Sequence, residues 1–146
     1  MTRAPKRVSW LARFKRWSSV RQAPQTVRQA HGRIGEQLAA SYLRRAGYRI
    51  EAANVRFRRG ELDLVAYDGK TLCFIEVRSV SSPHFGTAAE SITRRKQQRI
   101  IRAAQHYLHR RRVPWEGDIR FDVVTIQRAQ DGTPVIELFR GAFEAR

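Results

Sequence analysis

The sequence has few of the features that mark secreted, zinc-binding or membrane proteins. Of its 146 residues only Cys73 is a cysteine, so neither a disulfide nor a cysteine zinc site can form within one chain, and a reducing cytoplasm is expected. Its apolar stretches are a few residues long, against the roughly 20 that a membrane-spanning helix needs. No secretory signal with an apolar middle region is visible. We therefore expect a cytoplasmic protein without a membrane partner.

Acidic residues are also scarce. The chain carries 29 Lys and Arg against 13 Asp and Glu, a formal net charge of +16. An excess of this size predicts polyanionic partners, of which nucleic acid is the commonest and acidic membrane surfaces and acidic proteins are the other classes. The 4 histidines show no ligand spacing with acids or with one another, so a zinc site of that kind is not expected.

The first 30 residues contain no acid at all. They hold eight of the Lys and Arg residues, and Trp10, Phe14 and Trp17 are spaced as on one side of a short helix. We interpret residues 1–30 as a basic appendage and residues 31–146 as one domain, which at this length can bury a core of ordinary size. A transit peptide or a membrane-surface helix is the alternative interpretation of the appendage.

Periodicity along the domain predicts two helices and five strands. Apolar residues at helical spacing run from about residue 32 to Gly47, a stop signal, and again over 92–109. Alternating or β-branched stretches between turn signals predict strands over 48–57, 61–67, 72–77, 119–126 and 135–139. The order is α-β-β-β-α-β-β. The helical crossover between the third and fourth strands implies parallel pairing there, in a mixed sheet flanked by helices, an α/β fold.

Two acids on neighbouring strands form the main candidate site. An Asp-Gly dipeptide marks a hairpin between the second and third strands, and the length of the connection places Asp63 directly opposite Glu76 or diagonally adjacent to it. Because side chains alternate along a strand, both acids share one face with Glu61 and Arg78. The apolar residues of these strands are expected to point the other way: Leu62, Leu64, Ala66, Cys73, Ile75 and Val77.

Opposed carboxylates repel each other, so their placement needs an explanation. A divalent ion such as Mg²⁺, which accepts one or two carboxylates together with waters and phosphate oxygens, would offset the repulsion. Such an ion can polarise a phosphate and activate a water for phosphodiester cleavage. The alternative is that Asp63 and Glu76 each pair with one of the many arginines.

Three further charged residues fall on or beside apolar faces. Glu36 lies at the edge of the first helical stripe, where it either faces the sheet or stabilises the first turn of the helix. Lys96 falls inside the second helical stripe, and with Arg94 and Arg95 it opposes the helix dipole. A phosphate would relieve this, or Lys96 simply extends along the apolar face to water. Asp122 lies on the apolar side of its strand, where we expect an arginine partner rather than a metal ion.

Several motifs resemble the YraN-like family of bacterial proteins. They are Gly-Glu-Leu-Asp-Leu-Val-Ala (60–66), Phe-Ile-Glu-Val-Arg (74–78), Gly-Glu-Gln-Leu-Ala-Ala-Ser-Tyr-Leu (35–43), Gly-Tyr (47–48), Arg-Arg-Lys-Gln-Gln-Arg-Ile (94–100) and Arg-Phe-Asp-Val-Val (120–124). The resemblance covers about residues 32–143 and leaves the appendage outside. It implies the restriction-endonuclease-like fold, similar to Holliday-junction resolvases.

The resemblance also implies a nuclease-type site of the pattern D…ExK. Asp63 and Glu76 match its metal-binding acids, Glu36 matches an extra acid of the resolvase-like branch, and the implied ion is Mg²⁺ or Mn²⁺. Arg78 stands where the pattern has its lysine. Arginine stays protonated, so it cannot be a general base, although it can stabilise charge on phosphate. Lys96 is our candidate to replace that lysine by reaching in from the helix.

The implied function is divalent-metal-dependent endonucleolytic cleavage of nucleic acid, with DNA, including branched DNA, as the expected substrate. Five arginines are candidate phosphate contacts: Arg58, Arg59, Arg94, Arg95 and Arg99. The departure at Arg78 favours a second hypothesis, in which the chain is a non-catalytic DNA- or RNA-binding module on the same fold.

Overall fold

Five strands form one sheet in the order in which they follow one another along the chain. They are β1 (Arg49–Phe57), β2 (Gly60–Asp68), β3 (Thr71–Val80), β4 (Ile119–Arg128) and β5 (Pro134–Phe143). Neighbouring strands are antiparallel except β3 and β4, which are parallel. The computed structural model describes residues 27–80, 92–112 and 114–146. Within them the order α-β-β-β-α-β-β and the parallel pair are confirmed.

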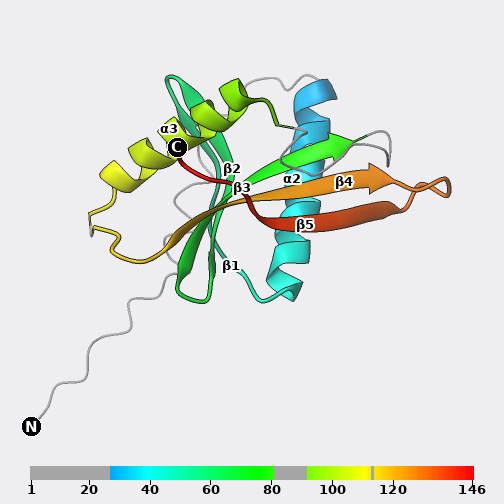
Figure 1. Ribbon diagram of the computed structural model, residues 1–146. Coiled ribbons are helices and arrows are strands. Elements are labelled where there is room, and N and C mark those ends of the chain that lie inside the picture. The colour runs from blue at the N-terminus through cyan, green and yellow to red at the C-terminus, as the bar shows by residue number, and fades with distance from the viewer. Residues whose placement is uncertain (1–26, 81–91, 113) are drawn as a thin grey trace, which may run out of the picture.

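Two helices cover opposite faces of the sheet, so the domain has three layers (Figure 1). Helix α2 (Val27–Arg45) packs Ala39, Ala40 and Leu43 on one face, and α3 (Arg94–His109) packs Ile100 and Ala104 on the other. This mixed sheet between helices is consistent with the restriction-endonuclease-like fold. No helix in the described residues is long and apolar enough to cross a lipid bilayer.

Helix α2 begins earlier than the periodicity predicts. Its first residue is Val27 rather than a residue near 32, so the helix extends into the segment interpreted as an appendage. Residues 1–26, which include the expected short helix around Trp10–Trp17, lie outside the described residues. Residues 27–31 are mostly polar and lack an apolar period, which is why the sequence pattern did not include them.

The hairpin between β2 and β3 sets the register of the candidate site. Asp68 pairs with Thr71 and the ladder runs to Leu64 opposite Ile75, so the same register places Asp63 directly opposite Glu76 rather than diagonally. The β2–β3 ladder ends there. Beyond it β3 continues along β4 as far as Val80, while β2 continues along β1 (Figure 1). The two acids therefore lie where β2 and β3 separate.

Strand β1 is distorted at Asn54, and this overturns one prediction. Asn54 lies opposite Asp63 between two regular pairs of the β1–β2 ladder and has φ 52, a left-handed conformation that asparagine tolerates better than most residues. Leu62, expected on the same face as Leu64, packs instead in the core under α3. The prediction was wrong because strict alternation assumes extended backbone in both strands, and the residue opposite Asp63 has a positive φ.

Candidate functional site

Asp63 and Glu76 face each other at the point where β2 and β3 separate, close enough for the charge of Asp63 to raise the pKa of Glu76. Oδ2 of Asp63 accepts the backbone N–H of Val77 at 2.9 Å, so a carboxylate takes the place that a strand carbonyl would have. Glu76 is almost completely buried, with 5% of its surface exposed. The protein thus holds two carboxyl groups together away from bulk water, which costs free energy unless charge is neutralised.

A shared proton supplies part of that neutralisation. Burial, and next the charge of Asp63, raise the pKa of Glu76 to about 7, although Lys96 acts in the opposite direction. Burial also raises the pKa of Asp63, against the lowering effect of hydrogen bonds from Val77 and Glu76. Near neutral pH Glu76 is therefore partly protonated beside Asp63, as carboxyl groups at short range favour.

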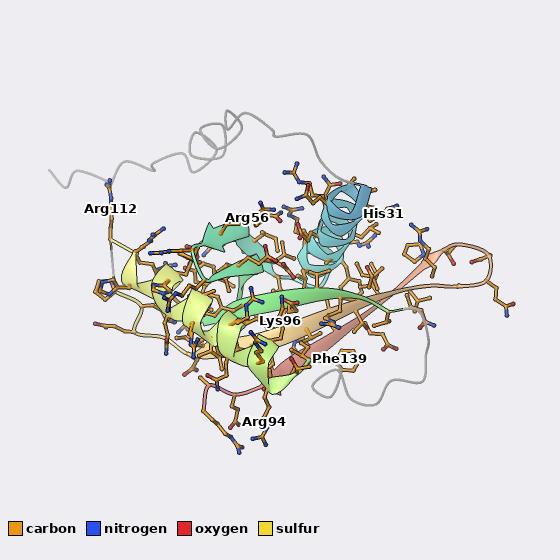
Figure 2. All side chains as sticks on the ribbon, turned by 90° about the horizontal axis from the view of Figure 1, so that it is seen from above. His31, Arg56, Arg94, Lys96, Arg112 and Phe139 are labelled. Atoms are coloured by element: carbon orange, nitrogen blue, oxygen red, sulfur yellow. The ribbon has the colours of Figure 1, made fainter. Side chains whose placement is uncertain are left out.

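Lys96 supplies a positive charge to the same pair. Its Nζ lies 3.1 Å from Oε1 of Glu76, and its side chain is 30% exposed. The helix start is fixed by Thr93, whose Oγ1 accepts the backbone N–H of Lys96 at 3.2 Å, an N-cap. Figure 2 shows Lys96 on the side of α3 that faces the strands, whereas Arg94 of the same turn points away from them. Of the two sequence interpretations, the side chain reaches the acids rather than extending to water.

Arg78 is not the cation that contacts Glu76. It is half-buried on β3, and among the described residues no ion pair joins it to Asp63 or Glu76. The cation that contacts Glu76 therefore comes from a different element than the motif spacing indicates. The sequence hypothesis that Lys96 reaches in from the helix agrees with this contact, and the docking of α3 across the sheet sets its distance.

Glu36 approaches the pair from the opposite helix. Burial raises the pKa of Glu36, and the charges of Asp63 and Glu61 add to this, while a side-chain hydrogen bond from Asn54 lowers it. Its Oε2 is buried and has no hydrogen-bond partner in the described part of the chain. Because α2 begins at Val27, Glu36 is not in the first helical turn, so the interpretation as a helix-dipole residue was wrong. Glu36 faces the sheet.

The three predicted metal ligands are not equivalent in space. No three His, Cys, Asp or Glu side chains of residues 27–80, 92–112 and 114–146 are grouped closely enough to hold a metal ion. The charge of Asp63 raises the pKa of Glu36, and Asn54 lowers it. Mg²⁺ needs only one or two carboxylates, so Asp63 and Glu76 could hold it by themselves. Their oxygen donors, their burial and their mutual repulsion fit a hard divalent ion.

Comparison with known proteins places the chain in one family. The family model described as Uncharacterised protein family UPF0102 matches residues 35–126. The chain belongs to this family. A UPF0102 protein of Herpetosiphon aurantiacus is 45% identical over 116 residues, covering 77% of this chain and 93% of the relative. UPF0102 protein STH1475 of Symbiobacterium thermophilum is 45% identical over 114 residues, covering 78% of this chain and 96% of that relative. A UPF0102 protein of Chlorobium limicola is 52% identical over 97 residues, covering 65% of this chain and 73% of that relative.

The UPF0102 match includes each residue of the candidate site, because Glu36, Asp63, Glu76 and Lys96 all lie within residues 35–126. Asn54 also lies within it and was missed by sequence reasoning. A signal was present, since asparagine is depleted in strands and interrupts the β1 pattern. Asn54 has a positive φ opposite Asp63, and its side chain lowers the pKa of Glu36.

The predicted phosphate-binding arginines of this UPF0102 protein lie on two neighbouring elements, the β1–β2 turn and α3. Arg58 and Arg59 are exposed in the turn between β1 and β2, and Arg94, Arg95 and Arg99 are exposed on α3. The turn packs closely on the helix, since a Cβ at Gly60 would lie 3.2 Å from the carbonyl oxygen of Arg99. The two groups of arginines are therefore neighbours.

Asp122 has a structural role, as expected. Its Oδ1 and Oδ2 accept hydrogen bonds from Nε and Nη2 of Arg120 at 2.7 and 2.9 Å. The backbone N–H of Gly141 donates to Oδ1 at 2.9 Å, and the Tyr48 hydroxyl donates to Oδ2 at 3.3 Å. With no exposed surface and four donors, Asp122 ties β4 to β5 and to the start of β1.

Proposed function

We propose that this UPF0102 protein is a divalent-metal-dependent nuclease that hydrolyses phosphodiester bonds in DNA. The observation that carries the proposal is the contact of Lys96 Nζ with Glu76 Oε1 beside Asp63. It supplies a lysine to the acid pair of a chain that has Arg78 where the D…ExK pattern has its lysine. A cytoplasmic location is part of the proposal.

The chain's residues would divide the work as follows. Asp63 and Glu76 would hold Mg²⁺ or Mn²⁺, which when bound polarises the phosphate and makes a water more acidic. The N–H of Val77 keeps the Asp63 carboxylate oriented toward Glu76. The ammonium group of Lys96 lies where it can orient the attacking water and stabilise negative charge on the phosphate. The water oxygen forms the new bond to phosphorus, the bond to the sugar oxygen breaks, and that oxygen leaves with a proton.

A second function has its own support, namely a DNA- or RNA-binding module without catalysis. The shared proton and Lys96 neutralise the acid pair without a metal ion. Arg78 cannot act as a general base. In this case the acid pair and Lys96 would be a structural ion cluster below a nucleic-acid-binding surface.

Cleavage assays on branched, flapped and single-stranded DNA with Mg²⁺ or Mn²⁺ separate the two functions. We expect the wild type to cleave, and Asp63→Asn and Lys96→Met to lower the rate by about 10²–10⁴-fold, the usual contribution of such groups. Lys70→Met is the matched control, because Lys70 is exposed in the β2–β3 turn at the far end of the hairpin. Activity that survives Lys96→Met as it survives Lys70→Met would contradict the role of Lys96, and activity that survives Asp63→Asn would place the cleavage outside this site. Binding without any cleavage would favour the module.

A further inference from the structure

Helix α3 carries an unusual distribution of charge. It contains four arginines and one lysine and neither Asp nor Glu. Cations at a helix N-terminus oppose the dipole and cost stability unless an anion is present. Apart from Lys96 with Glu76, no ion pair within the described ranges involves an α3 side chain. The charges are therefore not explained by partners in that part of the protein.

Three of these arginines form one row that continues through His106 to the C-cap residue Arg110. Arg95, Arg99, Arg102, His106 and Arg110 follow one another at steps of three or four residues, which places them on the same side of the helix, and all are exposed. The row, which we call the α3 ridge, is about 22 Å long at 1.5 Å per residue. It begins one residue before Lys96, so one end of it adjoins the acid pair.

Packing against the β1–β2 turn fixes the position of the ridge. The ring of Phe57 stacks on His106 with centroids 5.7 Å apart, and the guanidinium of Arg110 lies 5.1 Å from the Phe57 centroid. Gly60 lies against the backbone of Arg99. The turn between these two contacts carries Arg58 and Arg59, so it adds cations beside the row.

We infer that the α3 ridge binds the phosphate backbone of a double-stranded DNA arm and leads it to the acid pair. A length of about 22 Å corresponds to six or seven base-pair steps at 3.4 Å each. A row of cationic side chains at helical spacing suits a duplex, whose phosphates are regularly spaced. The inference deepens the proposed function by naming the surface that holds its substrate.

Two other polyanions fit the ridge less well. Single-stranded nucleic acid is usually held by exposed aromatic side chains on which bases stack. Besides its histidines, α3 has one aromatic residue, Tyr107. It is half-buried in the core and donates a hydrogen bond to Glu51. A membrane-surface helix needs large apolar side chains on its exposed face. The exposed large apolar residues of the described ranges are Ile34, Ile119 and Val135, none of them on α3.

Fluorescence anisotropy in EDTA tests the inference without cleavage. The probe is a 12-base-pair duplex, with a single strand of the same length for comparison, titrated at several salt concentrations. Arg99→Ala combined with Arg102→Ala should reduce the slope of log K against log salt by about 1.8, since each phosphate contact contributes about 0.9. Arg44→Ala combined with Arg45→Ala removes the same charge from exposed positions at the end of α2 and should leave the slope unchanged. Thermal melts of both variants establish that they fold.

The outcomes are distinguishable. A loss of slope in the α3 variant alone, with duplex preferred over single strand, supports the inference. Equal losses in the two variants, or a single strand bound as tightly as the duplex, overturn it, because the net charge or another surface is then responsible. If duplex binding follows the ridge but the wild type does not cleave with metal, the nuclease proposal fails and this inference stands. If the wild type cleaves and the ridge variant binds duplex as the wild type does, this inference fails and the nuclease proposal stands.

Discussion

The ammonium nitrogen of Lys96 lies 3.1 Å from Oε1 of Glu76, so a helix on one face of the sheet supplies a positive charge to a carboxylate on the central strand. The acid pair therefore depends on the docking of α3 as well as on the β2–β3 hairpin. This contact connects the packing of the domain with the chemistry proposed for it.

The first prediction concerns Arg78. Because Lys96 already contacts Glu76, we expect Arg78→Lys to change metal-dependent cleavage by less than about tenfold, well under the 10²–10⁴-fold of a group that takes part in proton transfer. Its melting temperature should shift by no more than about 4 °C, as for a substitution outside the core. Lys96→Arg is the companion variant, assayed on the same branched substrate, and it should lose most of the activity. A large gain in Arg78→Lys would place Arg78 in the site instead.

The second prediction concerns the pH dependence of stability without metal. In the folded protein the pKa of Glu76 is raised to about 7 from an ordinary 4.5, chiefly by burial, so the folded state binds this proton more tightly than the unfolded chain does. The stabilisation of the folded state by this proton is complete below pH 4.5 and is lost as pH rises to 7. The free energy of unfolding should fall in this window by up to about 1.4 kcal/mol per pH unit.

Urea denaturation at a series of pH values measures this dependence. Glu76→Gln should flatten the profile, since glutamine does not titrate. Glu144→Gln, an exposed carboxylate on the C-terminal segment, should leave it as in the wild type. A profile in Glu76→Gln that is as steep as that of the wild type would assign the dependence to other groups.

The third prediction concerns the divalent ion. Mg²⁺ or Mn²⁺ should raise the melting temperature, by an amount that corresponds to about 2.7 kcal/mol when the ion is at 100 times its Kd. The gain should be larger at pH 8 than at pH 6, because the ion must displace the proton shared by Asp63 and Glu76. Differential scanning calorimetry of the wild type and Asp63→Asn tests this. An equal gain in the variant would remove the ion from this pair.

The fourth prediction concerns the buried ion pair on β4. Asp122→Ala should destabilise the fold by about 3–5 kcal/mol, because it leaves the guanidinium of Arg120 without its main buried partner. Glu137→Ala removes an exposed carboxylate from the neighbouring strand and should cost less than about 0.5 kcal/mol. Chemical denaturation compares them. A small effect of Asp122→Ala would mean that Asp68 alone satisfies Arg120.

The elements with a strong local signal could be predicted from the sequence. The Asp-Gly turn and the alternation around it predicted the hairpin that brings Asp63 to Glu76, and the helical crossover predicted the parallel β3–β4 pair. The arginine partner of Asp122 followed from the cost of burying an unpaired charge. In each case the signal lies within a few residues or in one general physical rule.

The remaining features depend on contacts between distant segments. The side of the sheet on which Leu62 packs changes because Asn54, on another strand, has a positive φ. The position of Lys96 in its apolar stripe was visible, but its partner is set by the angle at which α3 crosses the sheet. Glu36 could be assigned to the sheet only once the start of α2 was known.

The backbone amide of Val77 gives this protein a spectroscopic reporter. It donates to a carboxylate of the acid pair where its neighbours in the ladder donate to carbonyl oxygens, so its proton chemical shift must follow the charge on Asp63. A single resonance in a nitrogen–proton correlation spectrum would then register protonation, metal binding or movement of Lys96 in the absence of any substrate. The state of the site can be observed through the main chain, at a residue whose own side chain takes no part in the chemistry.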